Sequence, residues 1–326
     1  MNILLISNEY NKLNRIGNPI ISRIKKSLST NSNINNVDFV PFKNSIKSFI
    51  DIRRAASKAD ILHIQFGGLY AFLIWFSLIG VRKPKLLTFH GTDIHAKEIN
   101  TTKSTIIKLK IWASQKASFC SIILFDKLGY VSETLLPYIP QWIYKRYKYK
   151  FFIQPLGVDY REFVIENQED ACKKLNIPFS KYVLFSDKTG TPLKRRDIAE
   201  AIIKELGDGY ELLIMCGVKP ELVPTYINAC CFILLTSDEE GSPNITREAL
   251  ALNKRVFSVD VGDVKQQIAG LSNSAIISRE PKQAAGVIRE KMSEPYLDNT
   301  RETLNIKLNF DIIAEKLVSE YCSLLN

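Results

Sequence analysis

Two glutamates with seven residues between them flank the start of a predicted helix in TSDEEGSPNITREALAL, residues 236–252. Ser242 is a favourable N-cap residue and Pro243 a favourable first helical residue, so we expect the helix to begin there. The first amides of such a helix lack intrahelical partners and form a site for an anion such as a diphosphate. Glu240 before this site and Glu248 beyond it would accept hydrogen bonds from two sugar-like groups. A capped helix with solvent-exposed acids would show the same spacing.

A second polar connection, FSDKTGTPLKRRDIAEA, follows an apolar strand pattern at residues 185–201. Its basic side chains are Lys188, Lys194, Arg195 and Arg196. A departing nucleoside diphosphate gains negative charge in the transition state, and cations aimed at it lower the barrier. The alternative interpretation is a solvated basic helix start.

A histidine directly follows a third apolar run in LLTFHGTDIH, residues 86–95. A histidine at the carboxyl end of a strand and before a glycine favours a site role for His90, whereas His63 inside the strand pattern ILHIQ is predicted to be structural. The sequence has no HExxH motif and no clustered Cys and His residues. We therefore expect neither a metal nor a cofactor.

Short apolar, β-branched runs alternate with longer helical patterns along the chain. The expected strands are at 3–7, 61–65, 85–89, 121–125, 182–186, 211–215, 231–237 and 255–260. This alternation predicts βαβ units with parallel sheets covered on both faces, and such sheets bind ligands at the carboxyl ends of their strands. The longest apolar run, 68–80, is too short to span a bilayer and predicts a buried helix. Pro and Gly in 154–163 suggest a hinge.

The 326 residues are 46% hydrophobic, enough to bury the cores of two domains. Six cysteines without paired spacing and an N-terminus without a leader pattern predict a cytoplasmic protein. Residues 1–165 carry 24 Lys and Arg against 10 Asp and Glu, a net +14, whereas residues 166–326 carry 20 against 24, a net −4. The basic half lacks nucleic-acid-binding motifs, so we do not expect nucleic acid as a partner.

Basic and aromatic residues are interleaved in three segments of that half, 46–58, 103–116 and 142–152. This combination suits a lipid headgroup region, because rings enter the interface while cations meet anionic lipid. We therefore expect peripheral attachment to the inner face of the cell membrane, weakened when Lys145, Arg146, Lys148 and Lys150 are neutralised together. Ordinary helices with solvated basic faces would show the same pattern.

The run EGSPNITREALA, within the longer stretch 224–264, resembles the Glu-x7-Glu motif of retaining glycosyltransferases of family four. The resemblance implies an α/β chain with the GT-B fold, in which two Rossmann-like domains face each other across a cleft. We accordingly expect an N-terminal acceptor-side domain at 1–157 and a nucleotide-sugar-binding domain at 158–308. A C-terminal helix at 309–326 is expected to pack back on the first domain.

The resemblance also assigns roles to residues. It implies that Glu240 contacts donor-sugar hydroxyls and Glu248 the ribose hydroxyls, and that His90 faces the donor sugar. Family members carry an Arg and a Lys six residues apart where this chain has Lys188 and Lys194, and a Gly-Gly pair where it has only Gly17. The implied catalytic residues are His90, Glu240 and Lys194. The implied donor-binding residues are Gly17, Lys188, Lys194, Arg195, Glu240, Gly241, Ser242, Pro243, Asn244, Ile245, Thr246 and Glu248.

The activity implied by the resemblance is transfer of a sugar, such as a hexose, from a nucleotide-sugar donor to a hydroxyl group with retention of configuration. The expected acceptor is a glycan or a lipid-linked acceptor in surface polysaccharide or glycolipid biosynthesis. Cationic side chains and helix amides would stabilise the leaving diphosphate, so no divalent metal is expected. The alternative is a catalytically silent nucleotide-sugar-binding subunit that supports a partner enzyme.

Overall fold

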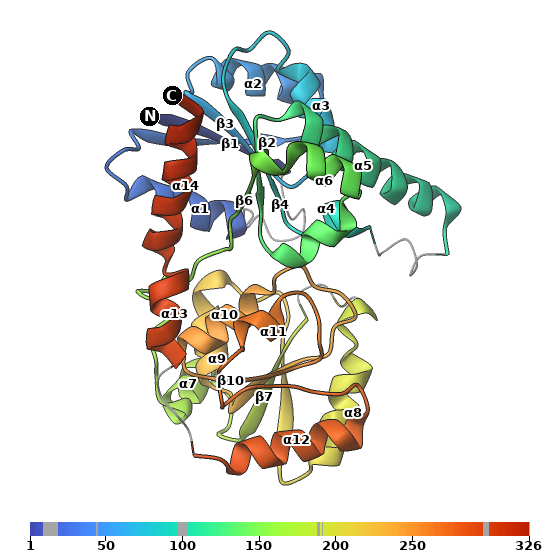
Figure 1. Ribbon diagram of the computed structural model, residues 1–326. Helices are drawn as coiled ribbons and strands as arrows, with labels where there is room; N and C mark the ends of the chain where they lie inside the picture. The colour runs from blue at the N-terminus through green and yellow to red at the C-terminus, as the bar shows by residue number, and fades with distance from the viewer. Residues whose placement is uncertain are drawn as a thin grey trace. The chain divides into compact units, whose positions relative to one another are not determined.

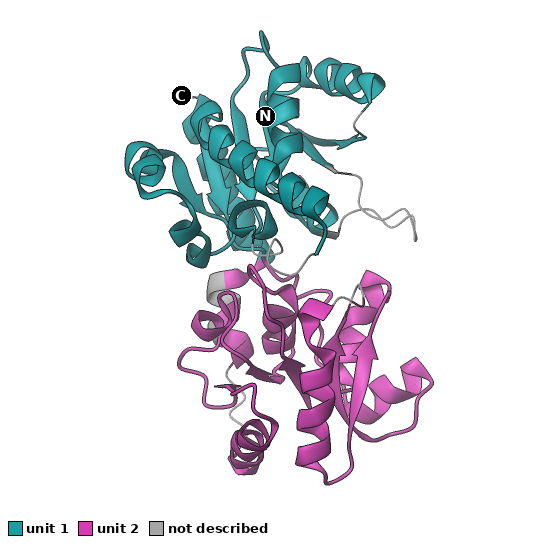
Figure 2. Cartoon of the chain, turned by 90° about the vertical axis from the view of Figure 1, so that its right-hand side faces the viewer, with its two compact units in different colours: residues 1–156, 310–326 teal, residues 157–309 magenta. Residues whose placement is uncertain are grey.

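The structure of the protein is a computed structural model. The chain divides into two compact units, which are shown in Figure 2. Unit 1 comprises residues 1–156 and 310–326, and unit 2 comprises residues 157–309. The structure describes residues 1–8, 19–43, 45–96, 103–187, 190, 192–295 and 300–325. The chain passes into unit 2 within the Pro- and Gly-containing segment 154–163 and returns to unit 1 for its last helix.

Unit 1 contains a parallel sheet (Figure 1). Its described strands follow the order β2-β1-β3-β4-β5-β6. The strands are β1 (Asn2–Asn8), β2 (Asn36–Phe42), β3 (Ile61–Gln65), β4 (Lys85–Phe89), β5 (Lys127–Tyr130) and β6 (Phe151–Ile153). Helices cover both faces of such a sheet, so its strands are apolar almost throughout. All five residues of β3 are buried.

The helices of unit 1 come from both parts of the chain. They are α1 (Pro19–Ser29), α2 (Ile46–Ala56), α3 (Leu69–Ser77), α4 (Thr92–His95), α5 (Thr105–Leu124), α6 (Gln141–Tyr147) and α14 (Phe310–Leu325), with 3-10 turns η2 (Glu133–Tyr138) and η3 (Lys148–Lys150). In α14, Leu317, Val318 and Tyr321 join a buried cluster with Ile3 and Leu5 of β1. The last helix is therefore part of the core of unit 1.

Unit 2 contains a second parallel sheet, in the order β11-β10-β9-β7-β8. Its strands are β7 (Lys181–Ser186), β8 (Tyr210–Met215), β9 (Phe232–Leu235), β10 (Arg255–Ser258) and β11 (Ala275–Ile276). Its helices are α7 (Gln168–Leu175), α8 (Arg196–Leu206), α9 (Val223–Asn228), α10 (Asn244–Ala251), α11 (Val264–Gln267), α12 (Pro281–Ser293) and α13 (Thr300–Leu308), with 3-10 turns η4 (Pro192–Lys194) and η5 (Pro220–Leu222). The ends of β7, β9 and β10 therefore meet at one edge.

The strand predicted at 121–125 is wrong. This run is the last turn of α5, where the Ser121 hydroxyl donates to the Ala117 carbonyl and Phe125 N–H donates to the Ser121 carbonyl. A short apolar run cannot be assigned to helix or strand by periodicity alone, and here the long helix before it continues through it. The strand follows as β5, and β2, β6 and β11 were not predicted.

The helix expected to be buried at 68–80 is α3, and the prediction is wrong for one of its sides. Ala71 and Ile74 are fully buried, whereas Leu69 and Phe76 are each 49% exposed. None of the helices in the described part of the chain has the length and apolar character needed to cross a membrane.

Candidate functional site

Lys194 and Glu240 form an ion pair at the carboxyl edge of the unit 2 sheet. Lys194 is the last residue of η4, which follows β7, and Glu240 lies in the loop after β9. Lys194 Nζ lies 2.5 Å from Glu240 Oε1, and the Ser237 hydroxyl donates to the same oxygen over 2.9 Å. Both side chains keep partial solvent access, at 27% for Lys194 and 15% for Glu240. The structure thus brings two predicted site residues into direct contact.

The loop after β9 is fixed to the turn that carries Lys194. The Thr236 hydroxyl donates to the carbonyls of Lys194 and Arg195, over 3.0 and 2.9 Å. Asp238 N–H donates to the Leu193 carbonyl over 2.8 Å. These bonds fix the backbone of the lysine's turn against the loop that carries the glutamate. The positions of the two side chains therefore do not depend only on the attraction between their charges.

Arg195, a predicted donor-binding residue, is engaged by carboxylates. Its guanidinium pairs with Asp197 at 2.8 Å and with Asp238 at 3.4 Å. Hydrogen bonds that Arg195 donates to Asp197 raise the pKa of Arg195 and lower the pKa of Asp197. Arg195 also has a left-handed backbone, with φ 51°, as the N-cap of α8. Its contacts in unit 2 are those of a residue that shapes the start of α8.

Arg279 supports the same loop and was missed by the sequence analysis. Its guanidinium donates to the Thr236 carbonyl over 2.8 Å and the Ser237 carbonyl over 2.9 Å, and it pairs with Asp238 at 3.0 Å. Nothing in the residues around Arg279 indicates this role, because its partners are about forty residues away in sequence.

The helix expected to begin at Pro243, with Ser242 as its N-cap, instead begins at Asn244. Pro243 is the N-cap and makes no side-chain capping bond. The Ser242 hydroxyl is engaged elsewhere: it donates to Asp263 over 2.5 Å and accepts from the Arg247 guanidinium over 2.6 Å. The predicted cap is wrong because the bonds to Asp263 and to Arg247 engage this hydroxyl in place of the first amides of α10.

Glu248 lies further along α10 and is 5% exposed. The remaining predicted donor-binding residues at this edge form the turn before α10 and its first turn. They are Gly241, Ser242, Pro243, Asn244, Ile245 and Thr246. Gly262, in the loop after β10, packs directly on this turn: a Cβ there would lie 2.8 Å from the Gly241 carbonyl oxygen, and its φ of 55° favours glycine. Three strand-end loops thus meet around the start of α10.

His90 begins the loop after β4 in unit 1. The Asp93 carboxylate closes this loop by accepting N–H bonds from His90, Gly91 and Gly67, the last over 2.7 Å. Burial raises the pKa of Asp93, and the N–H donors oppose that shift. His90 Nε2 lies 2.8 Å from Gln65 Oε1, and burial lowers the pKa of His90 to about 3. The imidazole is therefore neutral at physiological pH.

Comparison with known proteins bears on the fold. No family model matches the chain, and no curated protein matches its sequence. The structure is similar to that of HepE from Anabaena, crystallised with UDP-glucose, with a TM-score of 0.76 and 11% identity, covering 99% of this chain and 100% of that one. Sucrose-phosphate synthase from Thermosynechococcus elongatus gives a TM-score of 0.70 and 15% identity, covering 99% of this chain and 98% of that one. For a glycosyltransferase from Rickettsia africae the TM-score is 0.70 and the sequence identity 14%, covering 100% of this chain and 98% of that one.

The chain has the GT-B fold. This confirms the fold class predicted from the sequence, because the similarity extends over essentially the whole chain and includes two parallel α/β sheets.

The predicted site residues are distributed over both units of this GT-B chain. Lys194, Glu240 and Glu248 belong to unit 2, and His90 belongs to unit 1. Gly17 and Lys188 lie outside the described residues. In unit 1 the sequence did not indicate Gln65 and Phe66, which contact His90, or the role of Asp93. The consecutive glycines Gly67 and Gly68 after β3 were the available indication of a special loop.

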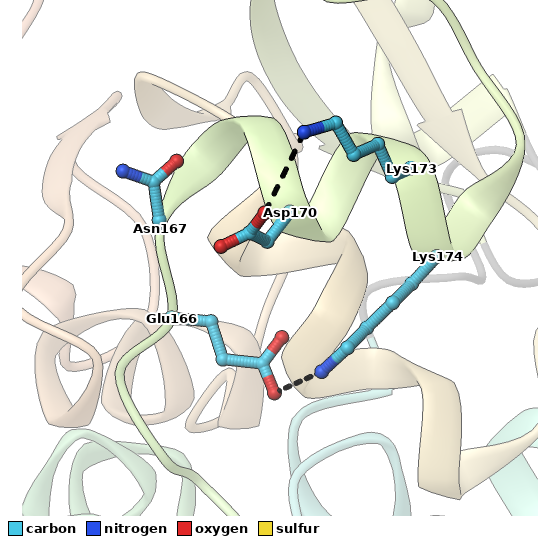
Figure 3. Close-up of a pocket in the computed structure, with 5 residues that line it drawn as sticks. All are labelled: Glu166, Asn167, Asp170, Lys173 and Lys174. Atoms are coloured by element: carbon cyan, nitrogen blue, oxygen red, sulfur yellow. Dashed lines mark hydrogen bonds and ion pairs between the residues drawn. The ribbon is translucent and has the colours of Figure 1, made fainter.

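A hollow beside α7 in unit 2 does not contribute to the candidate site. Figure 3 shows this hollow on the surface. It is lined by Glu166, Asn167, Asp170, Lys173 and Lys174. Its lysines pair with its own acids, at 2.7 Å for Lys174 with Glu166 and 3.8 Å for Lys173 with Asp170. Within the described ranges, no group of three or more His, Cys, Asp or Glu side chains could hold a metal ion.

Proposed function

We propose that this chain is a retaining glycosyltransferase that moves a sugar from a nucleotide-sugar donor to a hydroxyl group of a glycan or a lipid-linked acceptor. The observation that carries the proposal is the Lys194–Glu240 pair at the start of α10, the helix that also bears Glu248. Two findings about neighbours in fold support a nucleotide-linked donor. HepE was crystallised with UDP and with UDP-glucose, and starch synthase IV from Arabidopsis thaliana with ADP and acarbose.

In this proposal each residue has a chemical task. The donor diphosphate lies at the first amides of α10, where a helix N-terminus favours an anion. Glu248 accepts from the ribose hydroxyls and Glu240 from the donor-sugar hydroxyls. Lys194 moves from Glu240 to the diphosphate as the bond between the anomeric carbon and the phosphate oxygen breaks. A departing phosphate oxygen takes the acceptor proton while the new glycosidic bond forms on the same face, which retains the configuration.

The direct test begins with a thermal-shift screen against UDP-, GDP- and ADP-sugars, because a ligand that binds only the folded chain raises its melting temperature. With the donor so found, the purified chain should hydrolyse it or transfer its sugar in EDTA, and NMR of the product should show a retained anomer. A lysine clamp needs no divalent metal, so chelation should not stop turnover.

Three results would count against this. Donor binding without turnover would support the silent subunit instead, and an inverted anomer would contradict retention. Loss of activity in EDTA with recovery in manganese or magnesium would show that a metal replaces the proposed cationic clamp.

We further propose that unit 1 binds an anionic membrane surface through the N-terminal half of α5, which suits a lipid-linked acceptor. Ile106, Leu109 and Trp112 recur every three residues along this half and therefore lie on one side of the helix. They are 69%, 63% and 50% exposed. Figure 1 shows this end of α5 extending beyond its neighbours in unit 1. Water would favour polar residues at these positions.

Further along α5, two serine hydroxyls bind the segment that follows β3. The Ser114 and Ser118 hydroxyls accept from the backbone N–H groups of Leu69 and Gly68, and Ser118 also donates to the Asp93 carbonyl. Residues 103–110 are all exposed, so the apolar side chains of the N-terminal half do not take part in that packing. Exposed lysines flank them at positions 103, 108, 110 and 116. Apolar residues beside cations fit anionic lipid rather than a neutral surface.

The structure changes one part of the membrane hypothesis. Lys150 was grouped with Lys145, Arg146 and Lys148 as a lipid-binding cation. Its ammonium instead donates to the carbonyls of Phe125 at 2.7 Å and Ile123 at 2.9 Å, at the end of α5. Neutralising Lys150 would disturb that helix end, so a test of lipid-binding cations should neutralise only Lys145, Arg146 and Lys148.

We expect the variant with Ile106, Leu109 and Trp112 all replaced by serine to lose at least about tenfold in binding to vesicles of phosphatidylglycerol and phosphatidylcholine. Each buried apolar side chain contributes roughly 1.5 kcal/mol or more, and tenfold corresponds to about 1.4 kcal/mol. Sedimentation measures the fraction of protein bound to the vesicles. For the unmodified chain this fraction should also fall when salt is added and when the vesicles contain phosphatidylcholine alone.

The matched control replaces three exposed apolar residues of unit 2, Val164, Ile165 and Phe179, by serine. It should bind vesicles like the unmodified chain. Equal losses in both variants, or equal binding to neutral and anionic vesicles, would contradict the proposal. Light scattering that shows a dimer abolished by the α5 substitutions would assign this face to a second copy of the chain instead.

A further inference from the structure

A cluster of polar side chains is buried within the parallel sheet of unit 1. Its members are His63, Gln65, Thr88, Gln154 and Tyr321, and each is at most 4% exposed. The Tyr321 hydroxyl lies 2.6 Å from His63 Nδ1, and Thr88 donates to Gln154 Oε1 over 2.8 Å. Gly129 on β5 provides the space, since a Cβ there would lie 2.6 Å from Thr88 Oγ1. Apolar residues of similar size would fill a sheet core without the cost of burying these groups.

The Gln65 amide connects this cluster to His90. Its NH2 donates to His63 Nε2 over 2.6 Å, and its carbonyl oxygen accepts from His90 Nε2 over 2.8 Å. The bond to the Gln65 carbonyl oxygen places the His90 hydrogen on Nε2. His63 Nε2 also lies 2.7 Å from the hydroxyl of Thr88, which itself donates to Gln154. Burial lowers the pKa of each histidine to about 3, and repulsion between the two protonated rings adds to the shift at His63, so both rings are neutral at physiological pH. Among the described residues, His90 Nδ1 has no hydrogen-bond partner and is left as an acceptor.

Phe66 holds the same imidazole from a second side. Its ring centroid lies 4.1 Å from that of His90, with the rings 31° from parallel. Phe66 adopts φ 72°, a left-handed conformation that is strained for a bulky L-residue. The following Gly67 keeps this turn close to β4, because a Cβ there would lie 2.6 Å from the Phe89 ring. A strained aromatic beside a loop residue is typical of a functional constraint.

We infer that Gln65 and Phe66 are positioning residues for His90, with the His63–Tyr321 pair anchoring Gln65 from the core. The inference rests on the proposed function, in which His90 meets the sugar substrate. Gln65 fixes the tautomer, and Phe66 fixes the plane of the ring. His90 then presents a neutral Nδ1 acceptor to a substrate hydroxyl group, without reorganisation when the substrate binds.

The test is NMR of the full-length chain with 15N-labelled histidine, which has only three histidines to assign. In the unmodified protein His90 should carry its hydrogen on Nε2 and stay neutral down to about pH 5. Gln65→Met should release the ring, so that both tautomers appear and the pKa rises. In the transferase assay the same variant should lower kcat/KM about five- to tenfold, as expected for one lost hydrogen bond.

Gln154→Met is the matched control, because it removes a buried glutamine amide from the same cluster without touching His90. It should lower the melting temperature as Gln65→Met does and leave the His90 tautomer unchanged. An Nδ1–H tautomer in the unmodified chain, or identical His90 spectra in Gln65→Met, would overturn the inference. These spectra do not require turnover, so failure of the proposed function and failure of the positioning role are separable.

Discussion

Replacing Lys194 by alanine is expected to lower the turnover number by about 100-fold or more, the usual effect of removing one group that stabilises transition-state charge. Donor affinity should fall by less than about tenfold, because the charge on the leaving diphosphate grows towards the transition state. Lys194 suits this role because a short bond to Glu240 and a turn tied to Thr236 hold its ammonium before the donor arrives. The measurements are steady-state kinetics and calorimetric titration with the donor.

A matched control is Lys204→Ala, which removes an exposed lysine from α8 and should leave both quantities unchanged. Lys194→Arg keeps the charge and should recover part of the rate. If Lys194→Ala turns over like the unmodified chain, the cationic clamp lies elsewhere. Arg195 and Arg196 would be the next candidates, although each is already paired with carboxylates in unit 2.

The alternating sheets and helices of this chain were predictable because each buried strand of a parallel sheet is a continuous apolar run. β3 and β4 begin and end where the pattern placed them, and β7 differs by one residue. The prediction failed at β5, whose sequence KLGY includes a glycine. Glycine has low strand propensity, and its place in β5 depends on Thr88 and Gln154, which meet there only in the folded chain.

The candidate site was predictable where its residues lie in one strand-end loop. Glu240, Glu248 and the start of α10 fall within a short run, so residue type and spacing indicate their chemistry. Arg279 and Asp263 act on that run from distant segments, and their roles depend on the tertiary structure. The same holds for the cap of α10: Ser242 has the right propensity, but Asp263 and Arg247 engage its hydroxyl.

His90 illustrates an intermediate case. Its position after an apolar run predicted a site residue, and its loop closure by Asp93 is local in sequence. Its neighbours Gln65 and Phe66 are the last residue of the adjacent strand β3 and the residue that follows it. The left-handed backbone of Phe66 contradicts the ordinary preference of an aromatic residue. Such violations of local preference are expected at functional sites, and a sequence pattern alone does not show them.

Glu248→Gln is expected to weaken binding of the nucleoside diphosphate selected by the thermal-shift screen by about 1.5–3 kcal/mol, or about 10- to 150-fold. The substitution keeps the size of the side chain and removes the charge that would accept from the ribose hydroxyls. Glu248 is almost fully buried on α10, so water cannot replace the lost interaction well. Calorimetric titration gives the affinity, and thermal unfolding without ligand shows whether the variant retains its fold.

Glu240→Gln is the informative comparison, because the two glutamates are assigned to different parts of the donor. If Glu248 contacts the ribose, its substitution should weaken the nucleoside diphosphate and the complete nucleotide-sugar by the same factor. If Glu240 contacts the sugar, its substitution should weaken only the nucleotide-sugar. Glu200→Gln, on the exposed side of α8 and paired with Arg196, should change neither affinity. If Glu248→Gln binds the nucleoside diphosphate as tightly as the unmodified chain, the ribose assignment is contradicted. If Glu240→Gln loses equal affinity for both ligands, Glu240 instead lies at the diphosphate, where its ion pair with Lys194 acts on the leaving group.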